Sequence, residues 1–196
     1  MGRDVLSGCR SAVTQTGCPV YKVFLGDKHT MKKLLTLIAM MGLACTQQAQ
    51  ASLADQINEN QTDWLLGSWE ADINGSTLTL TYKWVVKDHV IASHLKTDDN
   101  ESYSLIALNP KTGEIEQTGY DSAGKKSTGK WGPKDDMPMV TITSTSDTGE
   151  TKSMAVAFRR IDGNNIEAQV FGVDDSGNVE DFSSFSFEME RKKAKK

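Results

Sequence analysis

Two histidines, His89 and His94, are the side chains of residues 52–196 best suited to binding a metal or moving a proton near neutral pH. They stand five residues apart, and His94 lies in a run that alternates as a β-strand does. Residues an odd number of positions apart on a strand point to opposite faces. The two histidines therefore cannot share a metal within one strand, and we predict no metal site here.

Carboxylates gather in two short acidic runs, at residues 98–101 and 174–178. Both faintly resemble a calcium-binding loop, but neither follows the full twelve-residue loop with its final Glu. Asp and Asn favour turns for local hydrogen-bonding reasons, so both runs are predicted to be acidic turns. The sequence also lacks a G-x-S-x-G motif, a Cys-His pair and a phosphate-binding loop. We therefore expect a protein that is not an enzyme and that carries no cofactor.

Aromatic residues form a third set of candidates, for contact with a small molecule. Such side chains offer a large apolar surface, and Tyr and Trp add a polar end. The same residue types are equally ordinary members of a packed core. The candidates for ligand binding are Tyr82, Trp84, His94, Tyr103, Tyr120 and Trp131.

The elements that must position these residues are short alternating runs cut by turn signals. In the clearest run, residues 76–86, one face holds Leu78, Leu80, Tyr82 and Trp84, and the other holds threonines and a lysine. Strands are predicted at residues 69–73, 76–86, 90–97, 102–108, 114–120, in a run that ends at residue 131, and at 139–146, 151–161, 165–173 and 179–190.

The links between these strands are too short for a crossover, so each strand must pair antiparallel with the next. A meander of ten strands leaves costly edges unless it closes. We therefore predict an all-β, antiparallel up-and-down β-barrel of about ten strands. Residues 52–66 are the one helical candidate, a short helix or coil over one mouth. A membrane barrel is disfavoured, because runs such as residues 114–117 are polar on both faces.

Residues 31–51 have the three parts of a secretory signal. Two lysines precede the apolar run at residues 34–44, and Ala49-Gln50-Ala51 forms a small-x-small cleavage site. The apolar run is too short to cross a bilayer, so no transmembrane span is expected in the mature chain. A buried core helix is the alternative, but the flanks of the run favour a signal helix.

The signal predicts cleavage between Ala51 and Ser52 and a periplasmic or secreted domain at residues 52–196. Lipid anchoring through Cys45 is the alternative. Residues 1–30 show no sustained period and are predicted to be an upstream extension, which is absent if translation starts at the internal methionine.

The composition of the exported segment limits the kinds of cross-link, metal site and partner that it can have. All three cysteines precede residue 52, so the domain would have no disulfide and no thiolate metal site. Residues 1–51 hold six of the 22 basic and two of the 26 acidic side chains, which leaves residues 52–196 with a formal charge of −8. That charge repels nucleic acid at long range, so no nucleic-acid partner is expected.

Four motifs carry a resemblance to known proteins. Leu-Leu-Gly-Ser-Trp-Glu at 65–70 is followed by Tyr-Lys-Trp at 82–84, by a Tyr-x-Leu-Ile strand with Asn-Pro-Lys-Thr-Gly at 103–113, and by Asp-Ser-x-Gly and Lys-Trp at 121–131. In these motifs the chain resembles small secreted bacterial lipocalin-like domains of unknown function, which are calycin-type barrels. The resemblance extends over nearly all of residues 52–196.

The resemblance implies a closure contact and a kind of ligand. In calycins the Trp of the first strand packs at the closed end against a basic residue of the last strand, so Trp69 and Arg191 are expected to touch. Relatives with known roles bind small apolar molecules inside the barrel. A nitrobindin-like haem site needs a late histidine, and none follows His94, so haem is not expected. The alternative is a filled barrel that acts as a protein-interaction module.

Overall fold

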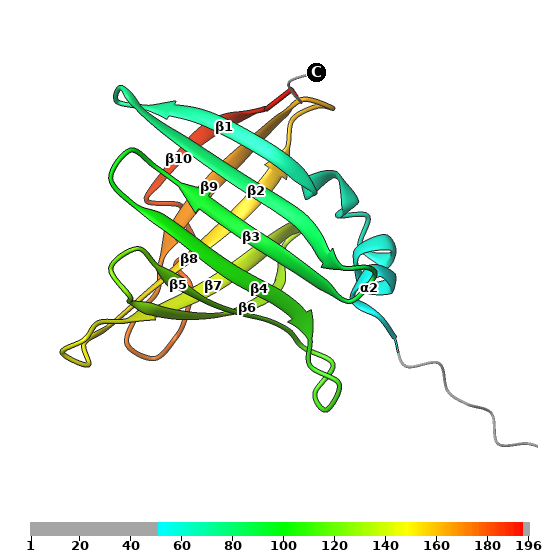
Figure 1. The fold of residues 1–196 in the computed structure, drawn as a ribbon, viewed down its shortest axis with the longest axis horizontal. Coiled ribbons are helices and arrows are strands. Elements are labelled where there is room, and N and C mark those ends of the chain that lie inside the picture. Colours follow the sequence, from blue (N-terminus) through cyan, green and yellow to red (C-terminus); the bar gives the residue numbers. More distant parts are fainter. Residues whose placement is uncertain (1–50, 194–196) are drawn as a thin grey trace, which may run out of the picture. The chain divides into compact units, whose positions relative to one another are not determined.

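Ten antiparallel strands pair in chain order in the computed structural model, which describes residues 51–193 (Figure 1). The first strand pairs with the last, so the sheet closes into a barrel and the predicted fold class is confirmed. The strands are β1 (Gly67–Ile73), β2 (Ser76–Val86), β3 (Val90–Lys96), β4 (Glu101–Leu108), β5 (Ile115–Asp121), β6 (Lys126–Lys134), β7 (Met137–Thr145), β8 (Thr151–Arg160), β9 (Asn165–Gly172) and β10 (Phe185–Arg191).

The upstream extension at residues 1–30, the signal helix and Cys45 lie outside the described residues, and Ala51 is the first residue within them. Of the chain that the structure describes, no helix has the length and apolar character needed to cross a bilayer.

The alternation read in β2 is present in the barrel wall. Leu80 and Tyr82 are buried in the interior, whereas Thr77 and Lys83 are exposed. The interior core is built from Leu53, Leu65, Trp69, Ala71, Leu80, Tyr82, Ile91, Ile106, Phe158, Ile166, Ala168 and Met189.

The last strand begins later than predicted, at Phe185 and not at Val179. The preceding segment is a loop, in which the Asp174 carboxylate accepts the backbone N–H groups of Ser176 and Asn178. These bonds close a turn, and the loop touches the sheet through an isolated bridge between Val173 and Val179.

Helix α2 (Leu53–Glu59) and the short 3₁₀ helix η1 (Asp63–Leu65) cover one end of the barrel, as predicted (Figure 1). Residues 53–66 are called the lid. Ser52 caps α2, because its hydroxyl accepts the Asp55 N–H while its own N–H donates to the Asp55 carboxylate. The Asp55 carboxylate accepts from the Ser52 backbone N–H and from the Ser52 hydroxyl, and these two bonds, the backbone one first, hold the pKa of Asp55 below its usual value. The Ala54 N–H donates to the Asp88 carbonyl in the β2–β3 turn, which docks the helix on the barrel.

The predicted contact between Trp69 and Arg191 is present where β1 meets β10. The two residues are directly paired, and the Arg191 guanidinium lies 4.1 Å from the Trp69 ring centroid. The guanidinium also donates to the backbone carbonyls of Leu66, at 2.9 Å, and Trp64, at 2.7 Å. Gly67 makes room for it, since its φ is 122° and a Cβ there would lie 2.5 Å from Nη1. Arg191 therefore fixes both the seam of the barrel and the end of the lid.

Candidate ligand cavity

A cavity of about 520 Å³ lies between the lid and the barrel end that it covers. Its lining comes from α2 and the segment after it, from the inward faces of several strands, from Gly113 in the β4–β5 loop and from the β6–β7 hairpin at residues 132–138. Segments far apart in the sequence therefore meet around one space.

The deep part of this cavity is apolar. Its wall residues are Tyr82, Ile91, Ile106, Ile115 and Trp131, and its apolar lid residues are Leu53, Ile57, Leu65 and Leu66. Gln56, Asn60 and Thr62 add polar side chains on the lid side. The arrangement suits a molecule that is apolar over most of its surface.

Polar ends of the aromatic wall residues are already paired inside the wall. Trp131 Nε1 donates to Gln117 Oε1 at 3.0 Å, and the Tyr82 hydroxyl bonds with Ser93. Tyr82 packs edge-on against Trp131 and Phe158, with ring centroids 5.9 and 6.3 Å apart. The rings therefore form a rigid floor that presents carbon, and not unpaired donors, to the cavity.

Burial raises the pKa of Tyr82 well above the usual tyrosine value of 10.0. In the unfolded chain this tyrosine ionises near that pH, whereas in the folded protein it keeps its proton. Its contribution to stability is thus complete below pH 10 and is lost as the pH rises further, by up to about 1.4 kcal/mol per pH unit.

Titration of tyrosinate absorbance tests this assignment. The chain has four tyrosines, and one of them is expected to ionise only when the barrel unfolds at alkaline pH. Tyr82→Phe should remove that delayed step, whereas Tyr103→Phe, at an exposed position, should leave it. A delayed step that survives in Tyr82→Phe would contradict the assignment.

The six predicted ligand-binding residues divide between the two faces of the wall. Tyr82 and Trp131 line the cavity. Trp84 faces inward and packs on the core, outside the cavity lining. His94, Tyr103 and Tyr120 lie on the outer surface, so the expectation that they face the interior is corrected; the two tyrosines are 56% and 57% exposed.

Strand register explains this outward row. His94 pairs with Tyr103, which pairs with Tyr120, and the three therefore share one face of β3, β4 and β5. His94 stacks on Tyr103 with ring centroids 4.0 Å apart, and its Nε2 lies 2.6 Å from the Glu101 carboxylate. His94 therefore has its partners, Tyr103 and Glu101, on the outside of the barrel.

The inward positions next to this row are small. Ser93, Ser104 and Gly119 are buried there. Sequence reasoning missed the cavity residues Ile91, Ile106 and Ile115, although an alternation that starts from these isoleucines gives the observed faces. The lid residues and the β6–β7 hairpin carry no such signal.

The acidic run at residues 174–178 is a turn, in which the Asp174 carboxylate accepts hydrogen bonds from Ser176 and Asn178. Hydrogen bonds from Asn178, its side chain first, hold the pKa of Asp174 below its usual value. Within residues 51–193 no three His, Cys, Asp or Glu side chains gather as metal ligands would.

Comparison of the sequence with models of protein families gives no match, and comparison with curated protein sequences gives none. The closed ten-stranded antiparallel barrel is consistent with a calycin-like fold.

Proposed function

We propose that this chain is an exported, lipocalin-like barrel that binds a small apolar molecule in the cavity beneath α2. The observation that carries the proposal is the cavity itself, because about 520 Å³ falls within the range of small-molecule sites. The signal-like segment at residues 31–51 supports the periplasmic or secreted location.

Burial of apolar surface would supply the affinity. Each methylene moved from water into the cavity contributes about 0.8 kcal/mol. The proposal assigns binding and not catalysis, because the aromatic groups of the floor already use their polar atoms within the wall.

Fluorescence titration with a neutral naphthylamine dye, which brightens in apolar surroundings, tests the proposal on the purified protein. Ile115→Trp adds an indole to the cavity wall and is expected to weaken dye binding at least about tenfold, since an overfilled site must shift its packing. Leu105→Trp is the matched control, because Leu105 is 56% exposed on the outer face.

Chemical denaturation of both variants separates a blocked cavity from an unfolded barrel. Absence of dye binding by the unaltered protein, or equal binding by folded Ile115→Trp, would overturn the proposal.

A protein-interaction module is the second candidate. The exposed outer face of Tyr103, Leu105 and Tyr120 favours it, since contiguous apolar surface marks interaction sites. The closed sheet offers no wholly unpaired edge strand for strand addition, since β1 pairs with β10 at two positions, so a partner would meet this outer face. Native mass spectrometry of protein from its own host separates the two: a retained small molecule supports the cavity, and a protein complex lost in Tyr103→Ser/Tyr120→Ser supports the module.

A further inference from the structure

The charge at the mouth of the cavity is of one sign. Among the described residues that line the cavity, the charged ones are Asp135 and Asp136. Both stand in the β6–β7 turn, where Asp135 takes a left-handed backbone with φ of 55°. An Asp or Asn tolerates that conformation, and the turn sets two carboxylates at the rim.

These carboxylates have no cationic partner among the ion pairs of residues 51–193. The neighbouring Lys134 is directed elsewhere, with its ammonium 4.9 Å from the centroid of the Phe171 ring. Lys130, on the same strand, pairs with Glu114 at 3.0 Å. The basic residues nearest in sequence therefore do not neutralise the carboxylates of Asp135 and Asp136.

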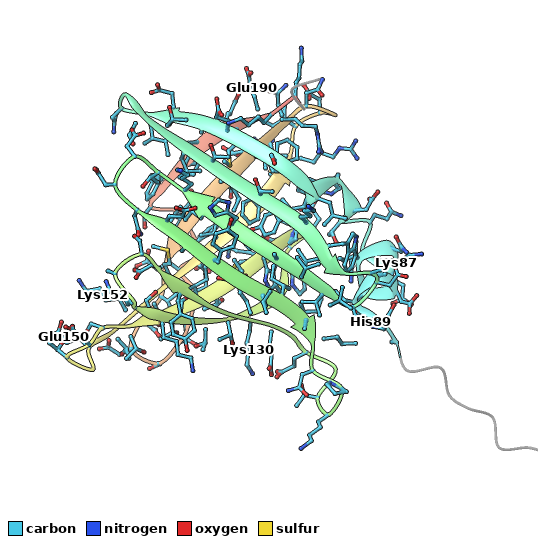
Figure 2. All side chains as sticks on the ribbon, in the orientation of Figure 1. Lys87, His89, Lys130, Glu150, Lys152 and Glu190 are labelled. Carbon is cyan, nitrogen blue, oxygen red and sulfur yellow. The ribbon has the colours of Figure 1, made fainter. Side chains whose placement is uncertain are left out.

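Other basic groups at this end of the barrel do not line the cavity. Lys87 and His89 stand beside α2, in and next to the β2–β3 turn that holds the helix (Figure 2). Neither belongs to the cavity lining. A ligand inside would thus meet an apolar floor and, at its polar end, two carboxylates.

From this arrangement we infer that the ligand is an apolar amine, with its hydrocarbon part in the cavity and its ammonium group at Asp135 and Asp136. The inference rests on the proposed function and deepens it. A fatty acid is disfavoured, because its carboxylate would lie beside two like charges. The formal charge of −8 on residues 52–196 also attracts cations and repels anions at long range.

Competition at low salt among decylamine, decanol and decanoate, each displacing the neutral dye, tests the inference on the purified protein. The three compounds share one chain length and differ in the charge of their polar group. Differences in their affinities therefore report the charge at the mouth of the cavity. Two exposed carboxylates attract an ammonium group modestly, so the amine should bind about tenfold more tightly than the alcohol, and decanoate more weakly than either.

The double variant Asp135→Asn/Asp136→Asn should bring decylamine to the affinity of decanol and leave decanol and the dye unchanged. Asp99→Asn/Glu150→Gln is the matched control, since it removes two charges from hairpin loops at the other end of the barrel and should keep the preference.

Equal displacement by all three competitors, or a preference that survives in the mouth variant, overturns the amine inference while cavity binding stands. Failure of the dye and of every competitor to bind overturns the proposed function and the inference with it.

Discussion

Replacing Trp69 with alanine is expected to lower the free energy of unfolding by about 4 kcal/mol. The side chain is fully buried, at 0% exposed, and it belongs to the core where β1 meets β10. Its Nε1 donates to the Leu65 carbonyl at 2.9 Å, so truncation also leaves a buried acceptor without its partner. Loss of a large buried aromatic ring costs about 3–5 kcal/mol, because the surrounding structure closes only part of the space.

Urea denaturation followed by far-ultraviolet circular dichroism measures this loss. Trp69→Phe keeps an aromatic ring without the N–H and should lose about half as much. Leu105→Ala, on the exposed outer face, should stay within about 0.5 kcal/mol of the unaltered protein. A loss below about 1 kcal/mol in Trp69→Ala would show that the indole does not hold the seam.

The barrel followed from the sequence because its strands and links each obey a local rule. Alternation in residues 76–86 set the inward face of β2, and the short turns allowed only antiparallel neighbours. Closure was then the remaining way to pair both edges, and β1 does pair with β10.

The outward row of His94, Tyr103 and Tyr120 runs against residue type, because aromatic side chains are expected inside a barrel. Alternation that starts from the inward isoleucines of β3, β4 and β5 gives the observed faces. A Cβ at Gly119 would lie 2.1 Å from the Ser104 hydroxyl and 2.3 Å from the Tyr103 carbonyl oxygen. Only glycine fits at that inward position. This close approach joins residues 15 positions apart, so the need for glycine at position 119 cannot be read from either strand alone.

The cavity was also beyond local rules. Residues that line it come from α2, the β4–β5 loop and the β6–β7 hairpin. These segments lie close together only because the barrel closes. Residue type identifies Tyr82 and Trp131, whereas nothing in the sequence around Asp135 and Asp136 distinguishes them from the residues of an ordinary turn. Their position at the rim follows only from the closed topology.

Replacing Arg191 with alanine is expected to lower the free energy of unfolding by about 3 kcal/mol and to loosen the lid. The guanidinium donates to the carbonyls of Trp64 and Leu66, and the net contribution of a hydrogen bond from a charged group is about 1.5–3 kcal/mol. Hydrogen exchange of the amides at residues 62–66 should become faster than that of the barrel strands, because this segment loses its anchor on β10.

Arg191→Lys separates charge from geometry. A lysine keeps the positive charge over the indole, but it lacks the planar fork that reaches two carbonyls at once. It should therefore lose most of the stability that alanine loses, about 2 kcal/mol. Retention of full stability in Arg191→Lys would mean that charge alone holds the lid.

The double variant Trp69→Ala/Arg191→Ala shows whether the contributions of the two residues to the free energy of unfolding are coupled. Arg191 lies over the Trp69 ring and bonds to the carbonyls on either side of Leu65, whose own carbonyl accepts the indole N–H. Because each residue holds the same short segment, removal of one should spare part of the cost of removing the other, by about 1 kcal/mol in a double-mutant cycle. Strict additivity would mean that the seam of the barrel and the end of the lid are held separately.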